Sequence, residues 1–174
     1  MPTGLNRIHL TLLCLLFCLL CLVSCSTQGG EEVVSRYPSG HRKETQIFTG
    51  SGSNKARLKV FEYYEGGEKK KEYNFKDGLF HGPFTYWYKN GDVFCRGMIE
   101  NKAINLTMVT GTETYYWPGG KKMLAAQTVK GQMKPGTHFI YWDEDGKEYT
   151  EQTRPAALLE KTKAITDHWE KGEI

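Results

Sequence analysis

Residues 75–91 read FKDGLFHGPFTYWYKNG, and they give the clearest indication of the fold. Asp77-Gly78 and Asn90-Gly91 are strong hairpin signals, because tight turns need positive φ angles that Gly, Asn and Asp tolerate. Between these pairs, residues 84–88 are rich in the aromatic side chains that strands favour. The stretch therefore predicts a strand that begins and ends near tight turns.

The same pattern recurs along the chain. Segments 82–91, 111–120 and 136–146 align on their leading glycines, and six positions then lead from that glycine to the last aromatic residue. A shorter copy ends at Gly67, and the terminal glycines of the four copies lie 24, 29 and 26 residues apart. Each unit is therefore long enough for two strands and two turns. The glycines predicted at repeat turns are Gly67, Gly78, Gly82, Gly91, Gly111, Gly120, Gly131, Gly136 and Gly146.

These repeats predict a mainly β fold. We expect each unit to form one antiparallel hairpin, and about four hairpins to stack into an elongated sheet over residues 46–152. Such a stack is nearly one-dimensional, because each hairpin buries its surface mainly against its neighbours.

Residues 75–91 resemble a MORN repeat, in the variant found in bacterial antitoxin-type MORN-repeat proteins. The shared pattern is an aromatic residue, Asp/Asn-Gly, a later glycine, a strand with Tyr and Trp, and Asn-Gly. His81-Gly82 matches the His-Gly pair of that family. The resemblance covers roughly residues 58–150 and is weakest through 91–117, where residues 105–110 form an insertion. It implies stacked hairpins and, as one functional alternative, an antitoxin or immunity-type protein.

The first 24 residues have the form of a secretory signal peptide. Arg7 precedes an apolar run over residues 10–23, and a small residue, Ser24, ends it. As a helix the run would reach about 21 Å, which is short of the ~30 Å hydrocarbon core of a membrane. An ordinary secretory signal and an uncleaved anchor helix remain alternatives to the interpretation that follows.

Residues 22–25, Leu-Val-Ser-Cys, resemble the lipobox of bacterial lipoproteins. The resemblance implies that the Cys25 thiol carries a diacylglyceryl group and that the signal peptide is cleaved between Ser24 and Cys25. Acyl chains of this kind hold a protein at a membrane. We therefore predict a membrane-anchored protein of the cell envelope. If the source has two membranes, Ser26 after the lipobox cysteine slightly favours the outer one over the inner one.

Two segments flank the predicted repeats. Residues 25–45 are polar and rich in Gly, Ser and charge, which predicts a flexible tether. After Pro155, apolar residues including Leu158 and Trp169 fall on one stripe at helical spacing, which predicts a helix over 155–171. We expect this helix to cap the end of the hairpin stack, and docking to a separate partner is the alternative.

Aromatic residues occupy two successive positions of every repeat. Because neighbouring strand residues face opposite sides of a sheet, we expect one aromatic column on each face. Stacking between strands would stabilise a thin sheet, whereas an exposed column would bind a partner. One column holds Tyr63, Trp87, Tyr116 and Tyr141, and the other holds Tyr64, Tyr88, Trp117 and Trp142. All of these except Tyr64 are candidate binding residues.

Composition argues against several classes of function. The formal net charge is +3 with charges interspersed, so nucleic acid is not an expected partner. The sequence lacks HExxH, GxSxG and P-loop motifs, and we predict neither catalysis nor a metal or cofactor other than the covalent lipid on Cys25. Cys95 has no partner if Cys25 is lipidated, and its strand position predicts a buried thiol.

Together these features predict a membrane-anchored lipoprotein whose hairpin repeats act as a protein-interaction or scaffold module in the bacterial cell envelope. Its expected partners are the membrane, through the lipid, and an envelope protein. A carbohydrate- or peptidoglycan-binding module that uses an exposed aromatic column is the first alternative, and an antitoxin or immunity-type protein is the second.

Overall fold

The computed structural model describes residues 30–102, 111–129, 132–133 and 139–174. The predicted signal peptide, Ser24, the lipidation site Cys25 and the turn glycines Gly131 and Gly136 lie outside these residues. In the described ranges, no helix is both long enough and apolar enough to cross a membrane.

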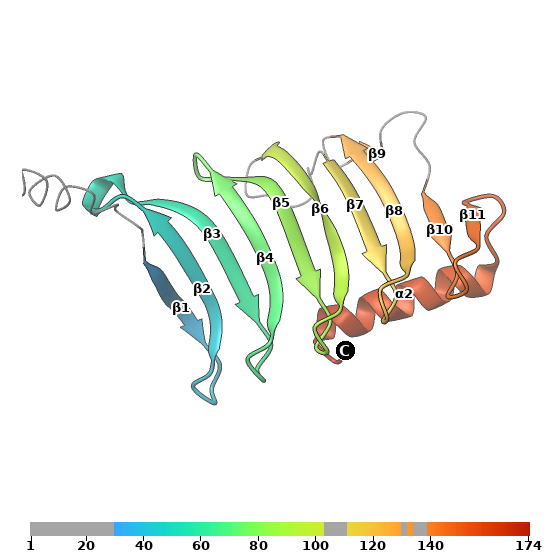
Figure 1. Cartoon of the computed structure of the whole chain (residues 1–174), viewed down its shortest axis with the longest axis horizontal. Coiled ribbons are helices and arrows are strands. Elements are labelled where there is room, and N and C mark those ends of the chain that lie inside the picture. The colour runs from blue at the N-terminus through green and yellow to red at the C-terminus, as the bar shows by residue number, and fades with distance from the viewer. Residues whose placement is uncertain (1–29, 103–110, 130–131, 134–138) are drawn as a thin grey trace, which may run out of the picture.

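One antiparallel sheet forms the body of the protein, and its strands lie side by side in chain order (Figure 1). Over the described residues it has eleven strands, with β9 paired to β8 at one side of the path. The predicted mainly β fold of stacked hairpins is confirmed. The strands are β1 (Glu31–Arg36), β2 (Arg42–Thr49), β3 (Ala56–Tyr63), β4 (Lys69–Lys76), β5 (Leu79–Trp87), β6 (Val93–Lys102), β7 (Gly111–Tyr116), β8 (Lys122–Val129), β9 (Gln132–Met133), β10 (Ile140–Trp142) and β11 (Glu148–Thr150), with a short 3-10 turn at Gly52–Asn54.

Five turns that connect successive strands share a single hydrogen-bond pattern. In the turn after β5, the Tyr88 N–H donates to the Asp92 carbonyl at 2.9 Å, and the Gly91 N–H donates to the Tyr88 carbonyl at 3.0 Å. Gly91 has a φ of +89°, a backbone conformation that would be strained in a residue with a side chain. The residues that open these five turns are Tyr37, Tyr64, Tyr88, Trp117 and Asp143.

The turn-opening side chains connect successive repeats. The Tyr88 hydroxyl donates to the Tyr116 carbonyl at 2.6 Å, and that carbonyl belongs to the residue just before the next turn. The other three donor–carbonyl pairs are Tyr37–Tyr63, Tyr64–Trp87 and Trp117–Trp142, at 2.6, 2.8 and 2.9 Å. We call these four bonds the turn ladder.

The hairpin around the first of these turns contradicts the prediction that residues 25–45 form a flexible tether. Residues 31–45 are not a flexible tether, because β1 and β2 pair along them and Val33 lies opposite Thr45. Tyr37 opens a turn that closes on Gly40, as Tyr64 does with Gly67. The polar composition of this segment is that of an edge hairpin with little apolar surface to bury. This hairpin is a fifth copy of the repeat, which the sequence pattern alone did not predict.

Two predicted turn glycines lie within strands. Gly82 belongs to β5 and Gly111 begins β7, so the repeat's leading glycine is a strand position. Gly82 has a φ of +91° and lies where the pairing register of β5 shifts. Its conformational freedom therefore serves a bulge in the strand rather than a turn.

Within the described ranges, the one α-helix is α2 (Ala156–Lys171), which lies behind the sheet in Figure 1 and runs from β11 back to β5. Pro155 precedes it, and Gly172 ends it in the left-handed conformation at a φ of +74°. The Trp169 ring stacks on Phe94 and Tyr86, with centroids 4.4 and 5.3 Å apart. The prediction of an end cap is wrong, because the apolar stripe of α2 is buried against a face of the sheet.

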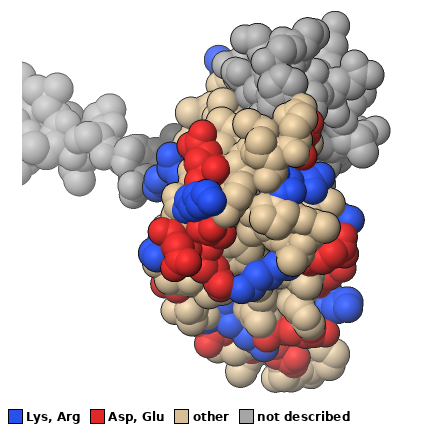
Figure 2. Space-filling model, turned by 90° about the vertical axis from the view of Figure 1, so that its right-hand side faces the viewer, with Lys and Arg blue, Asp and Glu red and all other residues tan. Residues whose placement is uncertain are grey.

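The end of the sheet near β11 carries mixed charges. Figure 2 looks onto this end and shows acidic and basic groups interspersed. Lys147 and Glu148 are exposed beside the last hairpin, and Lys161 of α2 pairs with Glu144. Charged side chains of this kind discourage further strands from pairing with a sheet edge.

Candidate binding face

The sheet has one face packed on α2 and one face opposite to it, which we call the open face. Tyr86 and Tyr115 belong to the cluster that packs toward α2. Because side chains alternate along a strand, the next residues, Trp87 and Tyr116, point to the open face. The open face is the candidate functional site, since α2 leaves it uncovered.

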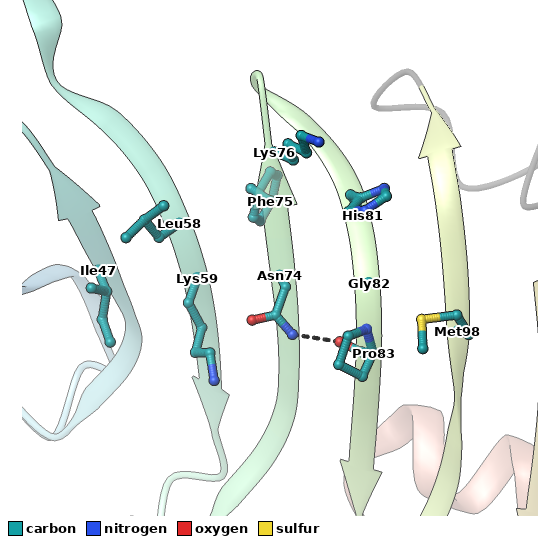
Figure 3. Close-up of a pocket in the computed structure, with 10 residues that line it drawn as sticks. All are labelled: Ile47, Leu58, Lys59, Asn74, Phe75, Lys76, His81, Gly82, Pro83 and Met98. Carbon is teal, nitrogen blue, oxygen red and sulfur yellow. Dashed lines mark hydrogen bonds between the residues drawn. The ribbon is translucent and has the colours of Figure 1, made fainter.

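A shallow groove of about 780 Å³ crosses strands β2 to β6 (Figure 3). Cross-strand partners form a row along it, because Lys59 lies opposite both Ile47 and Asn74, and Pro83 lies opposite Met98. The Asn74 side chain links the two parts of the row by donating a hydrogen bond to the Pro83 carbonyl at 2.5 Å. The remaining residues of the groove are Leu58, Phe75, Lys76, His81 and Gly82.

Irregular strand pairing shapes this groove. Leu58 is an extra residue of β3, because Ile47 pairs with Lys59 while Phe48 pairs with Arg57. On the other side, residues 81–83 of β5 lie opposite the single residue Asn74 of β4. Bulges of this kind bend a strand and re-aim its side chains. The groove therefore results from local breaks in an otherwise regular ladder.

The lining of the groove is mainly apolar with a basic contribution. Leu58 and Met98 are each 44% exposed, which is high for large apolar side chains. Lys59 is paired with Glu72, and Lys76 is exposed. Among the described residues, no group of His, Cys, Asp and Glu side chains could hold a metal ion. This lining is better suited to contact with apolar side chains of a partner than to metal binding or catalysis.

The structure separates the two predicted aromatic columns. Tyr64, Tyr88 and Trp117 are buried at the turn positions, at 2–3% exposure, where they form the turn ladder. They are therefore structural residues with no surface for a ligand. Burial raises the pKa of the Tyr64 hydroxyl to about 12 and also raises that of Tyr88.

The fourth copy of the alignment is shifted by one residue. Tyr141 is in the cluster that packs toward α2, so it does not belong with Trp87 on the open face. Trp142 takes that place, and Asp143 opens the turn. The cause is one extra residue between Gly136 and Gly146, and counting back from the turn glycine would have found it.

The open-face column alternates with basic side chains. Arg42 lies over the Tyr63 ring at 4.1 Å from its centroid. Lys69 is near two rings, at 4.4 Å from the Phe61 centroid and 5.8 Å from the Trp87 centroid. The next two pairs are Arg96 over Tyr116 and Lys122 over Trp142, each at 5.1 Å. We call the four cations and the four rings of the open-face column the cation–aromatic row. The sequence reasoning found the aromatic residues but missed the cations, although Arg42, Lys69 and Lys122 each follow a turn glycine by two positions.

The rings of this row differ in exposure. Tyr63 and Tyr116 are 3% and 8% exposed, whereas Trp87 and Trp142 are half-buried. The four cations are the outer layer, since all of them are exposed. A basic group held over an aromatic face contributes about 0.5–1 kcal/mol at an exposed site. The row is thus able both to stabilise the sheet and to present ordered positive charge.

Cys95 lies in the core and not on the open face. It is fully buried on β6, and burial raises the pKa of its thiol far above the usual range. A protonated, inaccessible thiol is a poor nucleophile. Cys95 therefore acts as a small apolar core residue.

Comparisons with known proteins show no family for this chain. No family model matches it, and no curated protein matches it. One solved structure, described as "Crystal structure of GtfA/B complex bound to UDP and GlcNAc", is similar over 75% of this chain and 24% of that chain. The identity is 10% and the TM-score 0.28, so this likeness bears on neither fold nor function.

Proposed function

We propose that the chain is a bacterial lipoprotein, held at a membrane by lipid on Cys25, whose MORN-like hairpins form a protein-interaction or scaffold module in the cell envelope. The open face is the docking surface. The observation that carries this proposal is the groove that crosses β2 to β6, with Leu58 and Met98 exposed in it. Exposed apolar side chains grouped on one face are typical of protein contact sites.

The shape of the sheet supports the same proposal. Strands β2 to β6 offer a continuous surface of neighbouring hairpins, as extended repeat proteins do when they bind partners. The lipid anchor would keep this surface near the membrane. We therefore propose a binding protein rather than an enzyme.

The test is a pull-down from the solubilised envelope of the source organism with the full chain as bait. We expect the wild-type chain to enrich one protein at a near-stoichiometric level. The double variant Leu58→Glu/Met98→Glu should lose at least about 90% of it, because two carboxylates would be desolvated in the contact.

Val33→Glu/Val34→Glu is the matched control, because these residues are also exposed, at 46% and 53%, but lie on the edge strand β1. It should retain the partner. Equal enrichment by the groove variant and the wild type would reject the groove as the docking surface.

Carbohydrate or peptidoglycan binding is the second candidate function. Trp87 and Trp142, half-buried on the open face, favour it. The full chain should then sediment with purified peptidoglycan, and Trp87→Ala/Trp142→Ala should abolish the sedimentation. A wild-type chain that stays in the supernatant would exclude this candidate.

A further inference from the structure

We infer that the cation–aromatic row binds a linear anionic polysaccharide that lies across the strands. The inference deepens the second candidate function and rests on it, and it is independent of protein docking in the groove. It names the chemical class of the ligand and assigns the main recognition to Arg42, Lys69, Arg96 and Lys122.

The first argument is the period of the row. Arg42, Lys69 and Lys122 hold equivalent positions at the starts of β2, β4 and β8, whereas Arg96 lies three residues into β6. Successive cations are two strands apart, which is about 9–10 Å across the sheet. From Arg42 on β2 to Lys122 on β8 the row crosses six strand spacings, about 29 Å. A polymer with one anionic group per repeating unit offers charge at a similarly regular interval, whereas acidic residues of a folded partner need not.

The second argument is the order of the layers. The four cations are exposed and lie beside the rings, so a ligand meets basic groups together with the rings. A neutral sugar that stacked on these faces would have to displace the cations. An anionic sugar can instead contact the cations while its ring packs on the accessible parts of Trp87 and Trp142.

The third argument is that nearby carboxylates neutralise the positive charge of the row only in part. Between described residues, the Arg42 guanidinium is 3.9 Å from a Glu31 oxygen, and the Lys69 ammonium is 3.7 Å from a Glu72 oxygen. Glu72 is shared with Lys59. Arg96 and Lys122 make no such ion pair with a described residue. The positive charge of the row is therefore least neutralised at Arg96 and Lys122, on β6 and β8.

The test uses the full chain in non-ionic detergent and isothermal titration calorimetry with polygalacturonate, a linear uronate polymer. We expect binding that weakens steeply as salt rises, because exposed charge contacts are screened. Lys69→Met/Lys122→Met should weaken it by about 10-fold, and Lys69→Arg/Lys122→Arg should restore it.

The matched control is Lys163→Met/Lys171→Met, which removes the same charge from exposed positions of α2. Because these lysines lie outside the row, their loss should change the affinity for polygalacturonate by less than about 2-fold, unless binding depends on net charge alone. An equal loss in the control pair would overturn the inference, as would absence of binding by the wild type at low salt. Circular dichroism of each variant establishes that it is folded.

Two further polymers separate the remaining possibilities. Neutral dextran binding as tightly as polygalacturonate would preserve carbohydrate binding but overturn the anionic ligand. Poly-glutamate binding more tightly than polygalacturonate would also overturn it and assign the row to acidic protein segments. The pull-down with the groove variant is unaffected by either result, so failure here is distinct from failure of protein docking.

Discussion

A single side-chain donor at each turn connects one repeat to the next. The Tyr88 hydroxyl is the best example, because it is buried and donates at 2.6 Å to a carbonyl 28 residues further along the chain. A bond of this kind stabilises modestly when present, but its loss leaves a buried polar group without a partner. The turn ladder therefore fixes the spacing of the hairpins as well as adding stability.

Tyr88→Phe tests this contact. We expect the free energy of unfolding to fall by about 1–2 kcal/mol, because the Tyr116 carbonyl loses a buried donor. Urea unfolding followed by tryptophan fluorescence measures it. Tyr149→Phe, whose hydroxyl donates to the partly exposed Asp143 carboxylate, should cost less than about 0.5 kcal/mol. Similar losses in both variants would contradict the role of the ladder.

Gly97 is a second decisive residue. A Cβ there would lie 2.1 Å from the Thr112 carbonyl oxygen and 2.7 Å from the Phe84 ring. We expect Gly97→Ala to destabilise the protein by about 2–3 kcal/mol, because the paired backbone of β7 cannot yield easily. Gly30→Ala, with open space around the added carbon, is the control in the same urea experiment. An unchanged midpoint for Gly97→Ala would show that β6 and β7 are further apart.

Among the secondary-structure elements, α2 packs across several strands on one face of the sheet. Its Trp169 ring stacks on the rings of Phe94 and Tyr86, and its indole N–H donates to the Trp87 carbonyl at 2.8 Å. The helical stripe predicted this element from the sequence, since a 3.6-residue period is a local property. Its place against the face was not predictable, because that depends on which apolar surface the sheet leaves uncovered.

Removing this anchor should destabilise the whole sheet. We expect Trp169→Ala to lower the free energy of unfolding by about 3 kcal/mol or more, as large-to-small core substitutions do. Thermal unfolding by circular dichroism measures the change, and the exposed Lys163→Ala on the same helix is the control. Equal melting temperatures for the two variants would mean that α2 is not part of the folded core.

The buried tyrosines of the turn ladder make the fold sensitive to alkali. Burial raises the pKa of Tyr64 to about 12, whereas an unfolded tyrosine ionises near pH 10. The unfolded chain therefore loses this proton first, so the contribution is fully present below about pH 10 and is lost as the pH rises toward 12. Urea midpoints at pH 9, 10 and 11 should fall, and Tyr64→Phe should flatten the decline. A midpoint independent of pH would contradict this assignment.

At the scale of the whole molecule, the proposed lipid anchor and the open face form one functional arrangement. Cys25→Ala should release the protein from the membrane fraction, because the acyl chains that hold it would be absent. Fractionation with labelled palmitate checks this. If the unmutated chain never incorporates palmitate, the lipoprotein proposal is wrong, while the hairpin fold is unaffected.

The antiparallel hairpin fold could be predicted from local features of the sequence. Turn glycines with positive φ angles and alternating aromatic residues act through local geometry, and they recur at a regular interval. The same logic could have found the copy at Tyr37–Gly40, which has an aromatic residue three positions before a glycine. It was missed because the polar composition of residues 25–45 was read as a tether.

Which surfaces are available for function depends on the tertiary structure. Burial of Tyr64, Tyr88 and Trp117 and the groove beside Asn74 follow from packing and pairing between strands. Whether a face is covered depends on where α2 packs. These are contacts between residues far apart in the chain, and no local pattern of glycines or aromatic side chains specifies them.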